Sequence, residues 1–240
     1  MSVETAISKT SSYFISQCQE RSEPSITGHP RSLRPAVSIA HQTGTGVSEV
    51  ARQVGGILDK SEFKGKQPWR IFDQQLIETA LEEQRWPKQL AEKITEETRL
   101  FLDELMDDLF GLRPPSWVLV PQVVETTLRL AMTGHAILVG HGATVVTAHL
   151  PNVFHVRLTG SLPKRIERAQ HSQGLASAAA ARIVRRGDRR RARYLKTHFH
   201  ARLDDELLYD LVVNTDRLSE DDAAGLIAGA AERFFAGRGI

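Results

Sequence analysis

One short stretch, residues 36–52 (AVSIAHQTGTGVSEVAR), constrains the fold of this chain more than any other. An apolar run comes first, Gly44 and Gly46 then make a turn, and a helical pattern opens at Val47. A buried run that leads through a glycine turn into a helix is typical of the α/β class. The stretch therefore predicts a strand, a tight turn and a helix.

The glycine turn is also a candidate phosphate site. Such a turn points successive backbone N–H groups inward and places a helix N-terminus beside them. Gly46 and Ser48 fit the end of the phosphate-loop pattern G-x-x-x-x-G-K-[ST], whereas His41 replaces its first glycine and Val47 replaces its lysine. Two interpretations stay open at this point: a nucleotide-binding loop, or a tight turn of the kind found in any α/β protein.

Short apolar runs recur along the chain and alternate with helical patterns. They centre near residues 37, 70, 137, 155 and 211. Because these runs are continuous rather than alternating, they indicate a parallel sheet covered by helices on both faces. In such a sheet the turns after the strands share one rim, where ligands bind. Asp73 lies at one of these strand-to-helix junctions, where it could cap a helix or contact a ligand.

Composition excludes disorder and membrane spanning. The chain is 41% hydrophobic and 25% charged, as soluble globular proteins are, and its apolar runs are far shorter than the roughly 20 residues of a membrane helix. The single cysteine, Cys18, cannot form an internal disulfide, so we expect a cytoplasmic protein without membrane contact. Residues 22–35 are rich in proline and serine, which predicts an N-terminal arm and linker over 1–34 and a folded domain over 35–237.

A dense basic segment lies at residues 182–196 (RIVRRGDRRRARYLK). It is either a solvated helix face or a set of guanidinium groups that neutralise phosphate charge during phosphoryl transfer. Nucleic-acid binding is a third use, but only Tyr194 and the nearby Phe199 supply aromatic rings there, and the net charge is only +2. We therefore expect no nucleic-acid partner, and no histidine set with metal-ligand spacing is present in the sequence.

The order of the motifs resembles the cytidylate-kinase-like family over about residues 35–235. The motifs are the glycine turn, FDxxLIE, ILVGxGA, FHVRL with a trailing KRIER helix, RRxDRxRARYLKxHF and YDLVVNT. The resemblance implies an α/β, three-layer P-loop kinase-like fold with a five-stranded parallel sheet, helices on both faces, and an arginine-rich lid at about residues 160–205. It also implies a nucleotide substrate, with ATP and Mg²⁺ as cofactors and CMP or a related monophosphate as acceptor.

The resemblance implies roles for particular residues. The donor phosphates would be bound by Thr43, Gly44, Thr45, Gly46, Val47 and Ser48, and Ser48 would also lie closest to the metal. The substrate-binding residues would be Asp73, which would lie by the acceptor nucleotide, together with His141, Arg165 and Arg168, of which the two arginines would clamp phosphates in or near the lid. The lid would contribute four catalytic arginines and an acidic residue that orients them: Arg186, Arg189, Arg190, Arg193 and Asp188.

This chain departs from the family pattern at three positions, namely His41, Val47 and His141. Family members often have arginine where His41 and His141 stand, and a second glycine at the position of Val47. Imidazoles are largely neutral at pH 7, so His41 and His141 lack the permanent positive charge that arginine would supply at these two positions. The sequence therefore supports two hypotheses: a nucleoside monophosphate kinase, or a catalytically weak nucleotide-sensing or partner-binding protein with the same fold.

Overall fold

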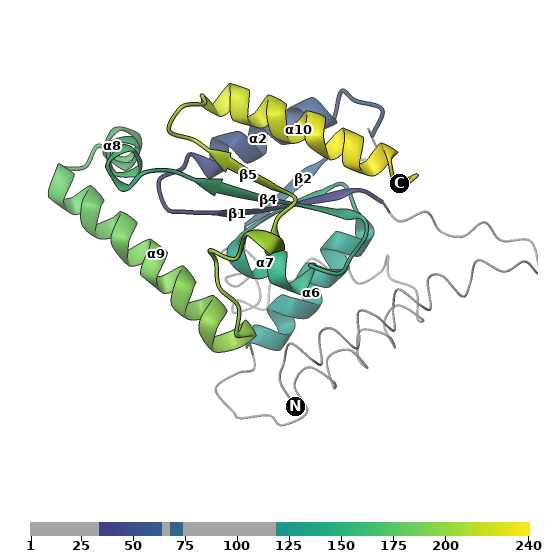
Figure 1. Cartoon of the computed structure of the whole chain (residues 1–240), viewed down its shortest axis with the longest axis horizontal. Coiled ribbons are helices and arrows are strands. Elements are labelled where there is room, and N and C mark those ends of the chain that lie inside the picture. Colours follow the sequence, from purple (N-terminus) through teal and green to yellow (C-terminus); the bar gives the residue numbers. More distant parts are fainter. Residues whose placement is uncertain (1–33, 64–67, 74–118) are drawn as a thin grey trace, which may run out of the picture.

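A computed structural model describes residues 34–63, 68–73 and 119–240 (Figure 1). Five strands form one sheet in the order β2-β3-β1-β4-β5. They are β1 (Ala36–His41), β2 (Arg70–Asp73), β3 (Ala136–Val139), β4 (Val153–Thr159) and β5 (Leu211–Asn214). Every neighbouring pair is parallel, which confirms the predicted five-stranded parallel sheet.

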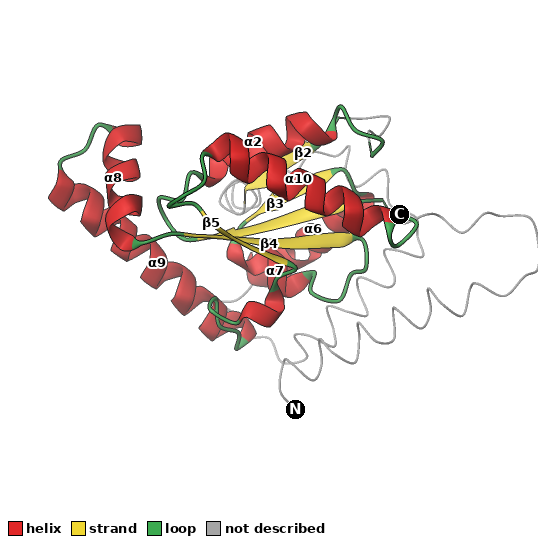
Figure 2. Cartoon of the chain, turned by 45° about the horizontal axis from the view of Figure 1, so that its top comes forward, coloured by secondary structure: helices red, strands yellow, loops and turns green. Residues whose placement is uncertain are grey.

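Helices cover both faces of this sheet, as predicted (Figure 2). The helices are α2 (Val47–Leu58), α6 (Leu119–Thr133), α7 (His141–Val146), α8 (Leu162–Gln173), α9 (Ser177–Phe199) and α10 (Glu220–Ala236), with a short 3₁₀ helix at Glu206–Leu208. One core lies between the sheet, α2 and α10, and a second lies between the sheet, α6, α7 and the end of α9. None of the helices in the described ranges is long and apolar enough to span a membrane.

Helix α2 begins where the sequence predicts it, and its apolar stripe explains why. Val50, Val54 and Leu58 are fully buried, because residues three to four apart share one face of a helix. Helix α10 begins at a reciprocal cap between Ser219 and Asp222, which satisfies amides that the first helical turn would leave unpaired.

Helices α8 and α9 project beyond the carboxyl ends of the strands, at the left in Figure 1. They share a small core of their own, in which Ala169, Ala180 and Val184 are buried. These two helices occupy most of the segment predicted as a lid. The boundaries of the arm, the domain and the lid stay predictions, and residues 1–33 and the stretch just after Asp73 lie outside the described residues.

A polar cluster links β4 to the start of β5 beneath the sheet. The Thr147 hydroxyl donates to the Ala143 carbonyl (2.7 Å) and so accepts from His155 Nε2 (3.1 Å). His155 Nδ1 then lies 3.4 Å from Asp210 Oδ2, which also accepts the His155 backbone N–H (2.8 Å). Burial alone would raise the pKa of Asp210, but these contacts with His155 hold the pKa below its ordinary value.

The first prediction concerns this cluster. Asp210→Asn should lower the free energy of unfolding at pH 7 by about 0.5–1 kcal/mol, a modest loss because the carboxylate is partly screened by water. A carboxyl whose pKa is depressed by folding stabilises the native state above its unfolded pKa of about 4 and loses that effect as pH falls through the folded pKa. Urea unfolding at pH 7 and pH 3 checks this, and an equal difference between variant and wild type at both pH values would contradict it.

Candidate phosphate-binding site

The turn between β1 and α2 has the backbone that its glycines allow. Gly44 (φ 84°) and Gly46 (φ 78°) both adopt left-handed conformations, which glycine enters at little cost. The buried Thr45 donates its hydroxyl to the Gln42 carbonyl (2.9 Å) and closes the turn. Gly46 then occupies the N-cap position of α2.

Successive amides in this turn have no acceptor among the residues that the structure describes. Within the part of the chain that the structure describes, the backbone N–H groups of residues 44–48 donate no hydrogen bond, while Glu49 and Val50 bond to the Gly46 carbonyl. Amides left over at a helix N-terminus, together with the helix dipole, favour an anion. The turn therefore has the chemistry of a phosphate cradle.

Two arginines of α8 hold the outer side of the turn. Arg165, only 5% exposed, donates through Nη1 to the Thr43 carbonyl (3.0 Å) and to Asp188 Oδ2 (2.6 Å), and through Nε to the Gly160 carbonyl (2.9 Å). Arg168 donates to the Gly44 carbonyl and, through its other terminal nitrogen, to the Thr215 carbonyl, both at 2.9 Å. Arg165 and Arg168, two of the four residues predicted to bind substrate, thus contact the loop itself.

Helix α9 also lies against the turn. Asp188 Oδ1 accepts the Thr43 amide (2.8 Å), and Arg191 donates to the Thr43 hydroxyl (2.6 Å). Arg191 also lies 2.8 Å from His41 Nε2, which accepts because a guanidinium has only donors. Burial lowers the pKa of Arg191, and the charges of Asp188 and Asp73 partly offset this. The glycine turn and the basic segment therefore meet at one rim of the sheet.

The structure does not bring the four predicted lid arginines to the turn. They are exposed, and no hydrogen bond or ion pair within the described ranges joins them to it: Arg186, Arg189, Arg190 and Arg193. Their catalytic role stays a prediction. The sequence analysis missed Arg191, although its position three residues after Asp188 places the two on the same side of a helix.

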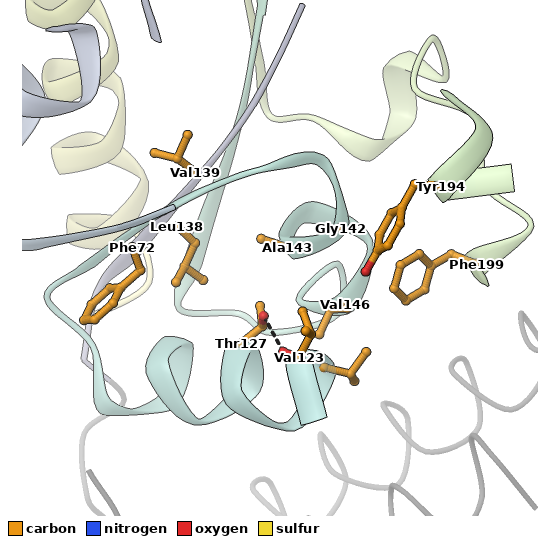
Figure 3. A pocket seen from close by; sticks show the side chains of 11 residues that line it. Phe72, Val123, Thr127, Leu138, Val139, Gly142, Ala143, Val146, Tyr194 and Phe199 are labelled. Carbon is orange, nitrogen blue, oxygen red and sulfur yellow. Dashed lines mark hydrogen bonds between the residues drawn. The ribbon is translucent and has the colours of Figure 1, made fainter. Parts of the chain in front are cut away.

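The predicted acceptor residues lie at the same rim as the turn. Asp73 ends β2 and His141 begins α7, directly after β3. A small apolar cavity lies nearby between α6, α7 and α9, lined by residues that include Phe72, Leu138, Gly142, Tyr194 and Phe199 (Figure 3). Its volume is about 10 Å³, which is room for about one water. The cavity as it stands cannot hold a nucleoside.

A larger, open depression lies on the other side of the turn. It has a volume of about 420 Å³ and is lined by α8 and by the residues that follow β5, among them Lys164, Arg168, Thr215 and Arg217. Arg168 connects this depression to the turn, because it bonds to Gly44 and to Thr215. The volume lies within the range of small-molecule sites.

Comparison with known proteins identifies the family. The model of the cytidylate kinase-like family matches residues 36–217, while a search of curated protein sequences gave no match. An uncharacterized protein from Eubacterium ventriosum superposes with a TM-score of 0.59 at 14% identity, covering 83% of this chain and 99% of that one. This likeness shows the fold alone.

Two kinases are more distant. A gluconokinase from Sinorhizobium meliloti (TM-score 0.40, 14% identity, 86% and 99% of the two chains) and a shikimate kinase from Bacteroides thetaiotaomicron (0.38, 13%, 86% and 99%) also match. The family model covers more than half of the chain, and the sheet is the one the family resemblance implies. The chain therefore belongs to the cytidylate kinase-like family and is a nucleotide kinase-like protein with a P-loop kinase-like fold.

Proposed function

We propose that this protein is a cytoplasmic nucleoside monophosphate kinase that uses ATP and Mg²⁺ to phosphorylate CMP or a related monophosphate. An oxygen of the acceptor phosphate attacks the γ-phosphorus of ATP in line, the bond to the β-phosphate oxygen breaks, and ADP leaves. The observation that carries the proposal is the run of amides at residues 44–48 ahead of α2, which have no acceptor within the described ranges 34–63, 68–73 and 119–240.

The residues around the turn fit a bound triphosphate. The amides supply donors, and the Arg191 guanidinium at Thr43 supplies a cation where Val47 has none. Ser48 is exposed in the first turn of α2, so its hydroxyl is available to Mg²⁺. This metal keeps several waters and takes most of its other ligands from phosphates, so one hydroxyl is a sufficient protein contribution. The metal would neutralise charge on the β- and γ-phosphates.

The two nucleosides would lie on opposite sides of the turn. The open depression beside Arg168 has the volume for the donor nucleoside, and the acceptor would lie toward Asp73 and His141. Arg186, Arg189, Arg190 and Arg193 remain our candidates for clamping phosphates. Because they are exposed on α9, that role requires α9 to shift when both substrates bind, as lids of phosphotransferases do.

A second candidate function is nucleotide sensing with little turnover. The contacts at Thr43 favour it, because Asp188 already accepts an amide that a phosphate would otherwise take. The same holds for His41, whose Nε2 accepts from Arg191 and carries no charge for a ligand in that state. In this function the protein would bind a triphosphate, and a partner would recognise the nucleotide-bound form.

The second prediction separates these functions. Val47→Lys places a cation in the first turn of α2, so turnover of CMP with MgATP should rise about tenfold or more if the chemistry is intact but weak. Ile57→Lys adds the same charge at the far end of the helix and should leave turnover unchanged. A coupled ADP assay measures both variants. Unchanged turnover in Val47→Lys with retained ATP binding would favour the sensor.

Ligand binding itself is measured by thermal unfolding, because a ligand that binds only the native state raises the apparent stability. ATP, CMP and their combination are each tested with and without Mg²⁺. Joint shifts by ATP and CMP support a kinase, and a shift by ATP alone supports a sensor. The absence of any shift across nucleoside mono- and triphosphates would overturn both.

A further inference from the structure

We infer that Arg165 and Arg168 act as positioning residues: they hold consecutive carbonyl groups of the turn from outside, and so aim the amides of Gly44 and Thr45 at the phosphate site. This rests on the proposed function. It assigns both arginines to the loop rather than to the phosphates, and it makes the binding geometry depend on α8.

The argument begins with the peptide unit. A trans peptide is planar, so its C=O and N–H groups point in opposite directions. The Thr43 carbonyl is held by Arg165 Nη1 (3.0 Å), which turns the Gly44 amide away from α8. The Gly44 carbonyl is held by Arg168 Nη1 (2.9 Å), which turns the Thr45 amide away in the same manner. Both amides belong to the run at residues 44–48 that donates to no described residue.

The donors of these arginines are committed to protein acceptors. Arg165 also bonds to the Gly160 carbonyl and to Asp188, and its side chain is only 6% exposed. Arg168 forms a fork between the Gly44 and Thr215 carbonyls, at 2.9 Å each. Such a bridge requires the planar guanidinium, because a lysine ammonium on its single flexible stem cannot reproduce the fork.

Helix α8 is itself anchored, so the arginines have a fixed base. The Ser161 amide donates to both carboxylate oxygens of Asp216 (2.9 and 3.0 Å). Hydrogen bonding from the Ser161 side chain, and then from its amide, holds the pKa of Asp216 below its ordinary value. The Gly160 amide donates to the side-chain oxygen of Gln42 (3.0 Å), at the start of the turn. The two residues that lead into α8 are therefore bonded to Gln42 and Asp216, and these bonds fix the start of α8 beside the loop.

The third prediction tests this inference with Arg168→Lys, Arg168→Gln and the control Arg182→Gln, an exposed arginine of α9. In the ¹⁵N-labelled protein without ligand, both Arg168 variants should shift the amide signals of Gly44 and Thr45. Affinity for pyrophosphate and for MgATP, measured by calorimetry, should fall about tenfold in both. The Arg182 variant should match the wild type in both experiments.

The outcomes separate the inference from the function. If Arg168→Lys keeps wild-type affinity and unaltered Gly44 and Thr45 amides, the arginine acts as a charge on the phosphate and the inference is wrong. If wild-type protein binds neither pyrophosphate nor MgATP, the proposed function fails, and the amide signals of the ligand-free variants still decide the positioning role. Thermal unfolding of each variant confirms that the compared proteins are folded.

Discussion

Asp188→Asn is expected to lower the free energy of unfolding by about 2–4 kcal/mol and to weaken MgATP binding. Asp188 bonds to the Thr43 amide through one oxygen and to Arg165 through the other. Removing its charge leaves the guanidinium of Arg165, which is only 6% exposed, without a carboxylate. Removing one partner of a buried ion pair lowers the free energy of unfolding by more than the intact pair contributes, because the other charge is left buried without a partner. The partial exposure of the Asp188 side chain (28%) reduces this loss.

An exposed ion pair provides the control for this fourth prediction. Asp204 pairs with Arg202 at 2.8 Å, and both side chains are well exposed. Asp204→Asn should leave the midpoint of urea unfolding at pH 7 within error of the wild type, because water screens such pairs. If Asp188→Asn were equally silent, the contact between α9 and the turn would not contribute to stability, and α9 could not be regarded as part of the site.

The sequence was sufficient to predict the fold because apolar patterns within a few residues indicate most of its strands and helices. The apolar run at Ala136–Val139 and the stripe at Val50, Val54 and Leu58 are continuous or periodic within a few residues. Such patterns report burial directly. The same reasoning placed the glycine turn and the basic segment at one rim, since parallel strands end together.

The pairs within the site could not be predicted in the same way. Thr43 and Asp188 are 145 residues apart, and Arg165 and Thr43 are 122 apart. All seven arginines between 182 and 193 look alike in composition, yet Arg191 is the one that bonds to the turn. The choice depends on which side of α9 faces the turn and the end of β1, and that is decided by long-range contacts.

Gly44→Ala should be the most damaging single-methyl change near the site, with a loss of about 3 kcal/mol or more in the free energy of unfolding. Gly44 has φ 84°, a conformation that costs an L residue about 1 kcal/mol. A Cβ there would also stand 2.4 Å from the Arg165 carbonyl oxygen. Because that oxygen belongs to the backbone of α8, it cannot swing aside, and the turn or the helix must move.

Gly174 separates strain from contact in this fifth prediction. It too has a positive φ (63°), but a Cβ there would meet nothing within 4 Å, so Gly174→Ala should lose only the conformational term of about 1 kcal/mol. Urea unfolding of the two variants therefore measures how tightly α8 holds the turn. Equal losses in the free energy of unfolding would mean that α8 moves away from the added methyl group at no energetic cost. A helix that moves so easily could not orient the amides of Gly44 and Thr45.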